Sequence, residues 1–143
     1  MFKNSLKLLA VAMMALALTA CSGGKPQIMG MDGSEVPAAF AHFPDVPFPD
    51  RSLLDLDETK VLGSGESWIG TVVFAVPYDT SATFDFYISE MPKLRWTEVA
   101  SVRSRISHLT YVRGNRAMQI LIENKFPKKS VVTITAIPNK AGL

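Results

Sequence analysis

The sequence predicts an α+β fold, in which an antiparallel sheet of about five strands carries one amphipathic helix packed across one face. Three observations lead to this class. The chain has 143 residues with 48% hydrophobic and 20% charged side chains, which is typical of one globular domain. One segment repeats apolar residues at helical spacing. The segments after it alternate, or run apolar between turn residues, as strands do.

The folded part is expected to start with an extended lead-in segment at residues 43–50, because its prolines favour extended backbone. Residues 53–56 and 60–62 suggest short strands at an edge of the sheet. Residues 67–76 form the strongest strand pattern of the chain. They are apolar on both faces, so we expect them near the centre of the sheet.

The helix is predicted over residues 81–94, with Thr80 or Ser81 as its cap. Pro92 has no N–H to donate to the preceding turn, so we expect a kink or an early last turn there. A helix with one apolar stripe needs a surface to lie on, and the sheet provides it. The stripe recurs at steps of three and four residues: Phe84, Tyr87, Ile88, Met91 and Leu94.

The segments after the helix read as a meander of strands. Gly114-Asn115 suits a type II′ hairpin turn with glycine first. The whole domain is expected to span residues 43–138, followed by a tail at 139–143. Four strands make up the meander: residues 96–103, 105–112, 117–126 and 131–137.

The N-terminus has the layout of a secretory signal peptide. Lys3 and Lys7 precede an uncharged apolar run at residues 8–20. As a helix this run spans about 20 Å, whereas the hydrocarbon core of a bilayer is about 30 Å thick. The run is therefore too short for a comfortable transmembrane helix. We predict that residues 1–20 are a signal peptide that is removed from the mature chain.

The apolar run ends in Leu18-Thr19-Ala20-Cys21, which resembles the lipobox of bacterial lipoproteins, and Cys21 is the only cysteine of the chain. The resemblance implies cleavage between Ala20 and Cys21. It also implies a diacylglyceryl group on the Cys21 sulfur and a further acyl chain, such as palmitate, on the new amino group. Two or three acyl chains anchor a protein stably, at about 0.8 kcal/mol per buried CH₂. The alternative is an ordinary cleaved signal in which Cys21 has no role.

The residue after the cysteine is Ser22 and not aspartate, which in Gram-negative members of this family implies sorting to the outer membrane. We therefore expect a lipid-anchored domain in the bacterial cell envelope, facing the periplasm. Residues 21–42 are rich in glycine and proline. They are predicted to form a flexible tether that lifts the domain off the bilayer.

A second resemblance concerns the end of the helix. Phe86-Tyr87, Met91-Pro92 and Trp96, after a proline-rich lead-in, resemble a small domain of uncharacterised bacterial envelope lipoproteins. The resemblance covers roughly residues 43–138 and implies a fold and a location but no reaction. Its pattern has glycine where this chain has Arg95. Glycine there would close the helix in the left-handed conformation, which costs arginine on the order of 1 kcal/mol.

Charge is unevenly distributed along the chain. Residues 21–90 carry a net charge of −8 and residues 91–143 a net charge of +8. One interpretation is that the two halves pair within one sheet. The other is an exposed basic patch for an anionic partner, which would be an envelope protein, a glycan or an anionic lipid. We expect no nucleic-acid partner, because a secreted and tethered chain would rarely meet one. Four arginines are the candidates for the patch: Arg103, Arg105, Arg113 and Arg116.

No residue pattern points to catalysis. The two histidines, His42 and His108, lack the spacing of metal ligands. Ser107 and His108 are neighbours on one strand, so their side chains point to opposite faces and cannot form a catalytic pair. We therefore predict no catalytic residue, no metal and no cofactor.

Five acidic residues cluster between positions 45 and 58. A solvated acidic edge explains this cluster better than a calcium loop, because the glycine and the closing glutamate of such a loop are missing. Trp68 and Trp96 are expected in the core or over the sheet and not on a ligand platform. The cluster contains five residues: Asp45, Asp50, Asp55, Asp57 and Glu58.

These observations favour one function. It is a membrane-anchored bacterial envelope lipoprotein whose folded part is a non-catalytic interaction domain. Two alternatives stay open, a small envelope hydrolase and an accessory subunit of an outer-membrane assembly complex.

Overall fold

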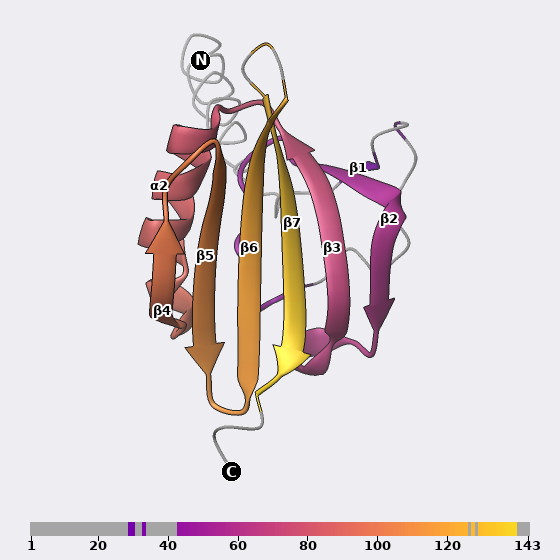
Figure 1. Ribbon diagram of the computed structural model, residues 1–143. Helices are drawn as coiled ribbons and strands as arrows, with labels where there is room; N and C mark the ends of the chain where they lie inside the picture. The colour runs from indigo at the N-terminus through magenta and orange to yellow at the C-terminus, as the bar shows by residue number, and fades with distance from the viewer. Residues whose placement is uncertain (1–28, 31–32, 34–42, 126, 128, 140–143) are drawn as a thin grey trace, which may run out of the picture.

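The structure is a computed structural model and describes residues 29–30, 33, 43–125, 127 and 129–139. Within these residues, seven strands form one sheet and a helix packs against it (Figure 1). This is the α+β class that the sequence predicts. The elements are β1 (Met29–Gly30), β2 (Leu53–Leu62), η1 (Gly65–Ser67), β3 (Ile69–Val76), α2 (Thr80–Glu90), η2 (Pro92–Leu94), β4 (Thr97–Val102), β5 (Ile106–Arg113), β6 (Arg116–Lys125) and β7 (Lys129–Pro138).

The strands lie in the order β1-β2-β3-β7-β6-β5-β4. Every neighbouring pair is antiparallel except β1 and β2, which are parallel. β3 lies between β2 and β7, so the strongest strand pattern is inside the sheet as predicted. The predicted strands at 53–56 and 60–62 are two parts of β2, which bulges between Asp55 and Lys60.

The core lies on one face of the sheet only. On β3 the side chains of Val72, Phe74 and Val76 point into it and are 1% exposed or less. Thr71 and Val73 point to the opposite face and are only half-buried. The sequence suggests a strand buried on both faces, and the structure corrects this, because the helix covers a single face of the sheet.

The helix covers the core through a narrow stripe of side chains. α2 packs against β5, β6 and β7. Phe84, Tyr87 and Met91 are each 5% exposed or less, and Leu94 packs partly buried at the end of the stripe. Ile88, which we expected in the same stripe, is 37% exposed. Each large apolar side chain that is fully buried here contributes about 1.5–3 kcal/mol.

The lead-in segment covers the rest of the same face. Phe43 packs edge-on against Trp68, with ring centroids 5.1 Å apart, and Phe48 packs on Phe74 at 5.0 Å. Trp68 and Trp96 are 1% and 2% exposed, which confirms their prediction as core residues. The lead-in is therefore part of the core and not only an approach to it.

α2 begins one residue earlier than predicted, because Asp79 caps it. The Asp79 Oδ1 accepts a hydrogen bond from the Ala82 N–H at 2.8 Å. The α-helix ends at Glu90 and the chain continues as the 3₁₀ turn η2. This is the early last turn that the position of Pro92 predicts.

The turn after η2 reverses the chain towards β4. The Trp96 N–H donates to the Met91 carbonyl at 3.2 Å, and the Arg95 N–H donates to the Pro92 carbonyl at 2.9 Å. This pair of bonds is a Schellman motif. Arg95 is left-handed, with φ 65° and ψ 25°. The turn thus forms with arginine at the position that favours glycine.

We expect Arg95→Gly to stabilise the protein. The left-handed conformation costs a non-glycine residue about 1–2 kcal/mol, whereas a glycine makes the unfolded chain more flexible by roughly 0.4–1 kcal/mol. The free energy of unfolding should therefore rise by about 0.5–1 kcal/mol, measured by urea denaturation. Lys93→Gly, in the right-handed turn next to it, is the control and should lower it. Loss of stability in Arg95→Gly would contradict the strain at this position.

Two tyrosines, Tyr87 on α2 and Tyr111 on β5, lie fully buried between the helix and the sheet. Burial raises the pKa of Tyr87 well above its usual value, and the neighbouring Tyr111 raises it further. Burial also raises the pKa of Tyr111 to about 12, with a contribution from Glu98. The Tyr111 hydroxyl donates to the Tyr87 carbonyl at 3.4 Å. The fold therefore holds both phenols in the neutral form.

Stability should consequently fall at alkaline pH. The unfolded tyrosines lose their protons near pH 10, while folded Tyr111 keeps its proton until about pH 12. The contribution of the neutral phenols is complete below pH 10 and is lost as the pH rises through 10 to 12. Thermal melts across this range should show a steeper decline for the wild type than for Tyr87→Phe/Tyr111→Phe. Parallel declines would contradict this prediction.

β1 brings part of the predicted tether into the sheet. Met29 and Gly30 pair with Leu53 and Leu54 at the start of β2. The prediction that residues 21–42 form a flexible tether is therefore wrong at residues 29–30, which lie in the described part of the chain. A two-residue strand has no periodicity that a sequence pattern could reveal.

Candidate functional site

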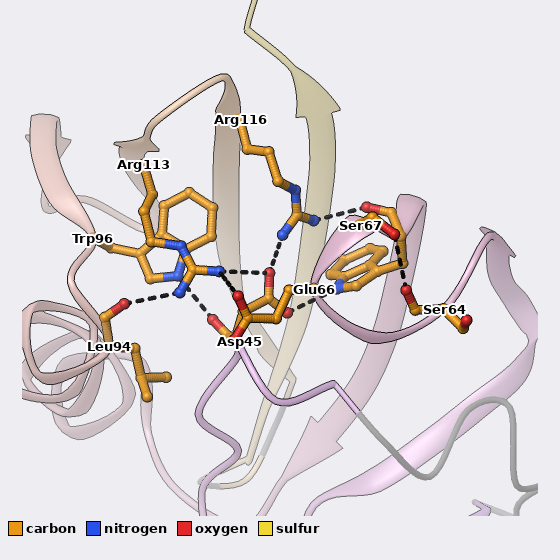
Figure 2. Close-up of polar contacts among 9 residues, drawn as sticks. Asp45, Ser64, Glu66, Ser67, Leu94, Trp96, Arg113 and Arg116 are labelled. Atoms are coloured by element: carbon orange, nitrogen blue, oxygen red, sulfur yellow. Dashed lines mark hydrogen bonds and ion pairs between the residues drawn. The ribbon is translucent and has the colours of Figure 1, made fainter.

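A buried polar cluster around Asp45 lies at the end of the sheet where β5 turns into β6 (Figure 2). Asp45 is 0% exposed. Its Oδ1 accepts a hydrogen bond from the Trp68 Nε1–H at 2.9 Å, and its carbonyl accepts one from the Trp96 Nε1–H at 2.8 Å. Its Oδ2 forms an ion pair with Arg116 and lies 3.6 Å from the Arg113 Nη2. The prediction of a solvated acidic edge is therefore wrong for Asp45.

Both arginines are held on several sides. Arg116 donates to the Trp68 carbonyl at 2.7 Å, and Arg113 donates to the Leu94 carbonyl at 3.0 Å. The Arg113 guanidinium lies 4.8 Å from the Trp96 ring centroid, a favourable cation–π distance. Their side chains are only 18% and 11% exposed, for Arg113 and Arg116 respectively. The cluster joins the lead-in, the start of β3, the end of η2 and the β5–β6 hairpin.

This arrangement corrects the predicted arginine patch. Arg113 and Arg116 turn inward to Asp45, so they are not available to an anionic partner. Arg103 lies at the other end of β5, where it pairs with Asp85 of the helix and stacks 4.1 Å from the Phe84 ring centroid. Of the four, only Arg105 has no ion-pair partner within the described residues. The four arginines therefore do not form one exposed surface.

The face of the sheet opposite the helix carries an open groove of about 900 Å³. Its floor is formed by β-branched and small side chains of β3 and β7: Thr71, Val73, Ala75, Val131 and Thr133. These residues stand in register across the two strands, with Val73 opposite Thr133 and Ala75 opposite Val131. The groove lies in the size range of ligand sites in proteins, roughly 300–1,000 Å³.

Charged side chains of both signs rim the groove. The bulge of β2 forms one wall, where the Asp55 Oδ1 accepts hydrogen bonds from the N–H groups of Asp57 and Glu58 at 3.1 and 3.2 Å. Thr59 replaces the backbone pairing that is interrupted at the bulge, because its hydroxyl accepts a hydrogen bond from the Val73 N–H at 3.0 Å. Six charged residues line the rim: Arg51, Asp55, Glu58, Glu123, Lys125 and Lys129.

The structure separates the side chains of Ser107 and His108. Ser107 is buried, and its hydroxyl donates to the Ser104 carbonyl at 3.0 Å, whereas His108 is exposed on the opposite face of β5. The prediction that these two side chains cannot meet is confirmed. In the described part of the chain no group of three or more His, Cys, Asp or Glu side chains is placed to hold a metal.

Several predictions lie outside the described residues. These are the signal peptide at 1–20, the cleavage site between Ala20 and Cys21, the lipidation of Cys21, and His42. Across the part of the chain that is described, no helix is both long and apolar enough to cross a membrane. Comparison with protein families, with curated proteins and with solved structures finds no match.

Proposed function

We propose that this chain is a bacterial envelope lipoprotein, anchored through acyl chains on Cys21, whose folded part is a non-catalytic binding domain. The signal-like N-terminus and the lipobox-like Leu18-Thr19-Ala20-Cys21 support the anchor. The groove on the open face of the sheet supports the binding role, and it is the observation that carries this proposal.

The chemistry of the groove favours an extended segment of another envelope protein as its ligand. The floor is largely apolar, and its rows of side chains match the two-residue repeat of an extended peptide. The rim offers three cations and three anions, which suits a polypeptide with charges of both signs. A glycan is disfavoured, because both tryptophans are buried and offer no ring to a sugar.

Photo-crosslinking in the native host tests the binding role. A photoreactive amino acid in place of Thr133, on the floor, should give a discrete protein adduct. Thr110 lies on the same face but outside the groove, and the same replacement there should give none. The Thr133 adduct should fall at least several-fold when Val73→Glu puts a charge on the floor. Equal adducts at both positions, or none at Thr133, would refute the groove as the binding site.

Mass spectrometry of the protein purified from its host tests the anchor separately. The mature chain should begin at Cys21 and carry the mass of a diacylglyceryl group on it. An unmodified sulfur would refute the lipoprotein assignment and leave the crosslinking result standing on its own.

A further inference from the structure

We propose that the end of the sheet where β2 begins faces the membrane, and that four cations there contact anionic phospholipid headgroups: Arg51, Arg105, Lys125 and Lys129. This inference rests on the proposed acylation of Cys21. It goes beyond it by assigning the domain an orientation and a lipid-contacting surface.

β1 lies at one edge of the sheet, beside β2. Met29 pairs with Leu53, so the chain from Cys21 reaches the sheet at the end where β2 begins. Only residues 22–28 separate Cys21 from Met29. When fully extended, the chain from Cys21 to Met29 spans at most about 27 Å. A strand of ten residues such as β6 is about 33 Å long. The end of the sheet where β2 begins must therefore stay within about 27 Å of the bilayer, which is less than the length of the sheet.

The strand topology places several connections at this same end of the sheet. From β2 across the sheet to β4, each strand is antiparallel to its neighbour. The β4–β5 turn and the β6–β7 hairpin therefore lie at the same end of the sheet as the start of β2 (Figure 1). This brings together residues from three distant parts of the sequence. Arg51 precedes β2, Arg105 lies in the β4–β5 turn, and Lys125 and Lys129 flank the β6–β7 hairpin. For convenience we refer to these four residues as the anchor-end cations.

The charges of these four side chains are available to a partner. None of the anchor-end cations has a carboxylate partner among the residues that the structure describes. Two carboxylates of this end are already engaged, because Asp79 caps α2 and Asp85 pairs with Arg103. Among the described residues, Asp50, Asp55 and Glu123 remain, so the four anchor-end cations outnumber the remaining carboxylates of this end by one. At the opposite end Arg113 and Arg116 are paired with Asp45 and Glu66. The anionic surface of a leaflet attracts unpaired basic side chains close to it.

Site-specific quenching on the acylated protein tests this orientation. Cys21 is the only native cysteine and its sulfur is blocked by acylation, so an introduced cysteine is the single site for a fluorescent label. Asn124 and Asn115 form a matched pair, because both are exposed asparagines beside opposite ends of β6. Each labelled variant is reconstituted into vesicles that contain headgroup-spin-labelled lipid, with phosphatidylcholine alone or with added phosphatidylglycerol.

Quenching should be several-fold stronger at Asn124→Cys than at Asn115→Cys, and phosphatidylglycerol should widen the difference. Arg105→Glu/Lys125→Glu/Lys129→Glu, in which three of the cations become acidic, should remove that widening. Equal quenching at both positions, or stronger quenching at Asn115→Cys, would overturn the proposed orientation. A difference that phosphatidylglycerol leaves unchanged would overturn the headgroup contact. If the wild type does not float with the vesicles, the anchor itself fails and this inference fails with it, so the two failures are told apart.

Discussion

Asp45→Asn is expected to lower the free energy of unfolding by about 3–5 kcal/mol, because it leaves Arg116 buried without a counter-charge and leaves Arg113 only the exposed Glu66 carboxylate, 3.3 Å away. The side chain is 0% exposed and pairs with Arg116 and Arg113, which are themselves largely buried. Asparagine keeps the shape of aspartate and an oxygen that can accept the hydrogen bond from the Trp68 indole. The loss of stability therefore reports the missing charge and not a change of shape. Since small domains are stable by only about 5–15 kcal/mol, this single change should bring the protein close to unfolding.

Urea denaturation followed by tryptophan fluorescence measures this effect directly. The two tryptophans of the chain, Trp68 and Trp96, both donate to Asp45, so their emission reports on the cluster itself. Asp50→Asn is the matched control, because Asp50 is an exposed acid of the same lead-in. It should change stability by no more than about 0.5 kcal/mol. If the two variants unfold at the same urea concentration, the Asp45 cluster does not hold the domain together.

A rescue variant separates charge from packing. The triple variant Asp45→Asn/Arg113→Met/Arg116→Met removes the three buried charges of the cluster. Buried ion pairs that are replaced together by apolar side chains often cost little, whereas removing one partner is costly. We therefore expect this triple variant to be more stable than Asp45→Asn alone. A lower stability would mean that the hydrogen bonds to Trp68 and Leu94, and not the balance of charge, are the main contribution.

Local patterns predicted most of the secondary structure, because the residues that decide it are close in sequence. β6 was expected at residues 117–126 and lies at Arg116–Lys125, and β7 was expected at 131–137 and lies at Lys129–Pro138. The early end of α2 follows from the missing N–H of Pro92. Gly114 has φ 57°, as glycine in the first position of the predicted hairpin turn requires.

The Asp45 cluster could not be predicted in the same way, because its partners are distant in sequence. Trp68, Trp96 and Arg116 lie 23, 51 and 71 positions from Asp45. No local period connects them. One signal was present, since Asp45 is a lone charge between Phe43 and Phe48 in an otherwise apolar, proline-rich segment. A charge placed there needs a buried partner, and two arginines on a hairpin were available.

The groove could not be predicted from the sequence either. Its floor depends on which face of β3 the helix leaves open, and its wall depends on the bulge of β2. The strand pattern at 67–76 is apolar on both faces and does not distinguish them. The bulge depends on Thr59, whose hydroxyl replaces a backbone partner of Val73, and on the close approach of β2 to Gly70.

Gly70→Ala is the second substitution for which we expect a large effect. Gly70 has φ 131°, a conformation that L residues rarely adopt, and a Cβ there would lie 2.1 Å from the Lys60 carbonyl oxygen. The next nearest atoms, the Lys60 carbonyl carbon and the Val61 Cα, are each 3.1 Å away, and all three are backbone atoms of β2, which cannot move aside as a side chain would. Backbone strain of about 1–3 kcal/mol and overpacking of about 1–3 kcal/mol together predict a loss of roughly 2–6 kcal/mol.

Gly114→Ala is the control that separates the contact from the backbone angle. Gly114 also has a positive φ, but a Cβ there would meet nothing within 4 Å, so its loss should be limited to about 1–2 kcal/mol of strain. Gly70 also sets the pairing of β2 beyond its bulge, since it lies opposite Val61. Gly70→Ala should therefore weaken the Thr133 crosslink as well, because the bulge is one wall of the groove, whereas Gly114→Ala should leave that crosslink unchanged. Equal losses of stability in the two variants would show that the close approach of β2 and β3 does not matter, and an intact crosslink in Gly70→Ala would show that the wall of the groove does not depend on it.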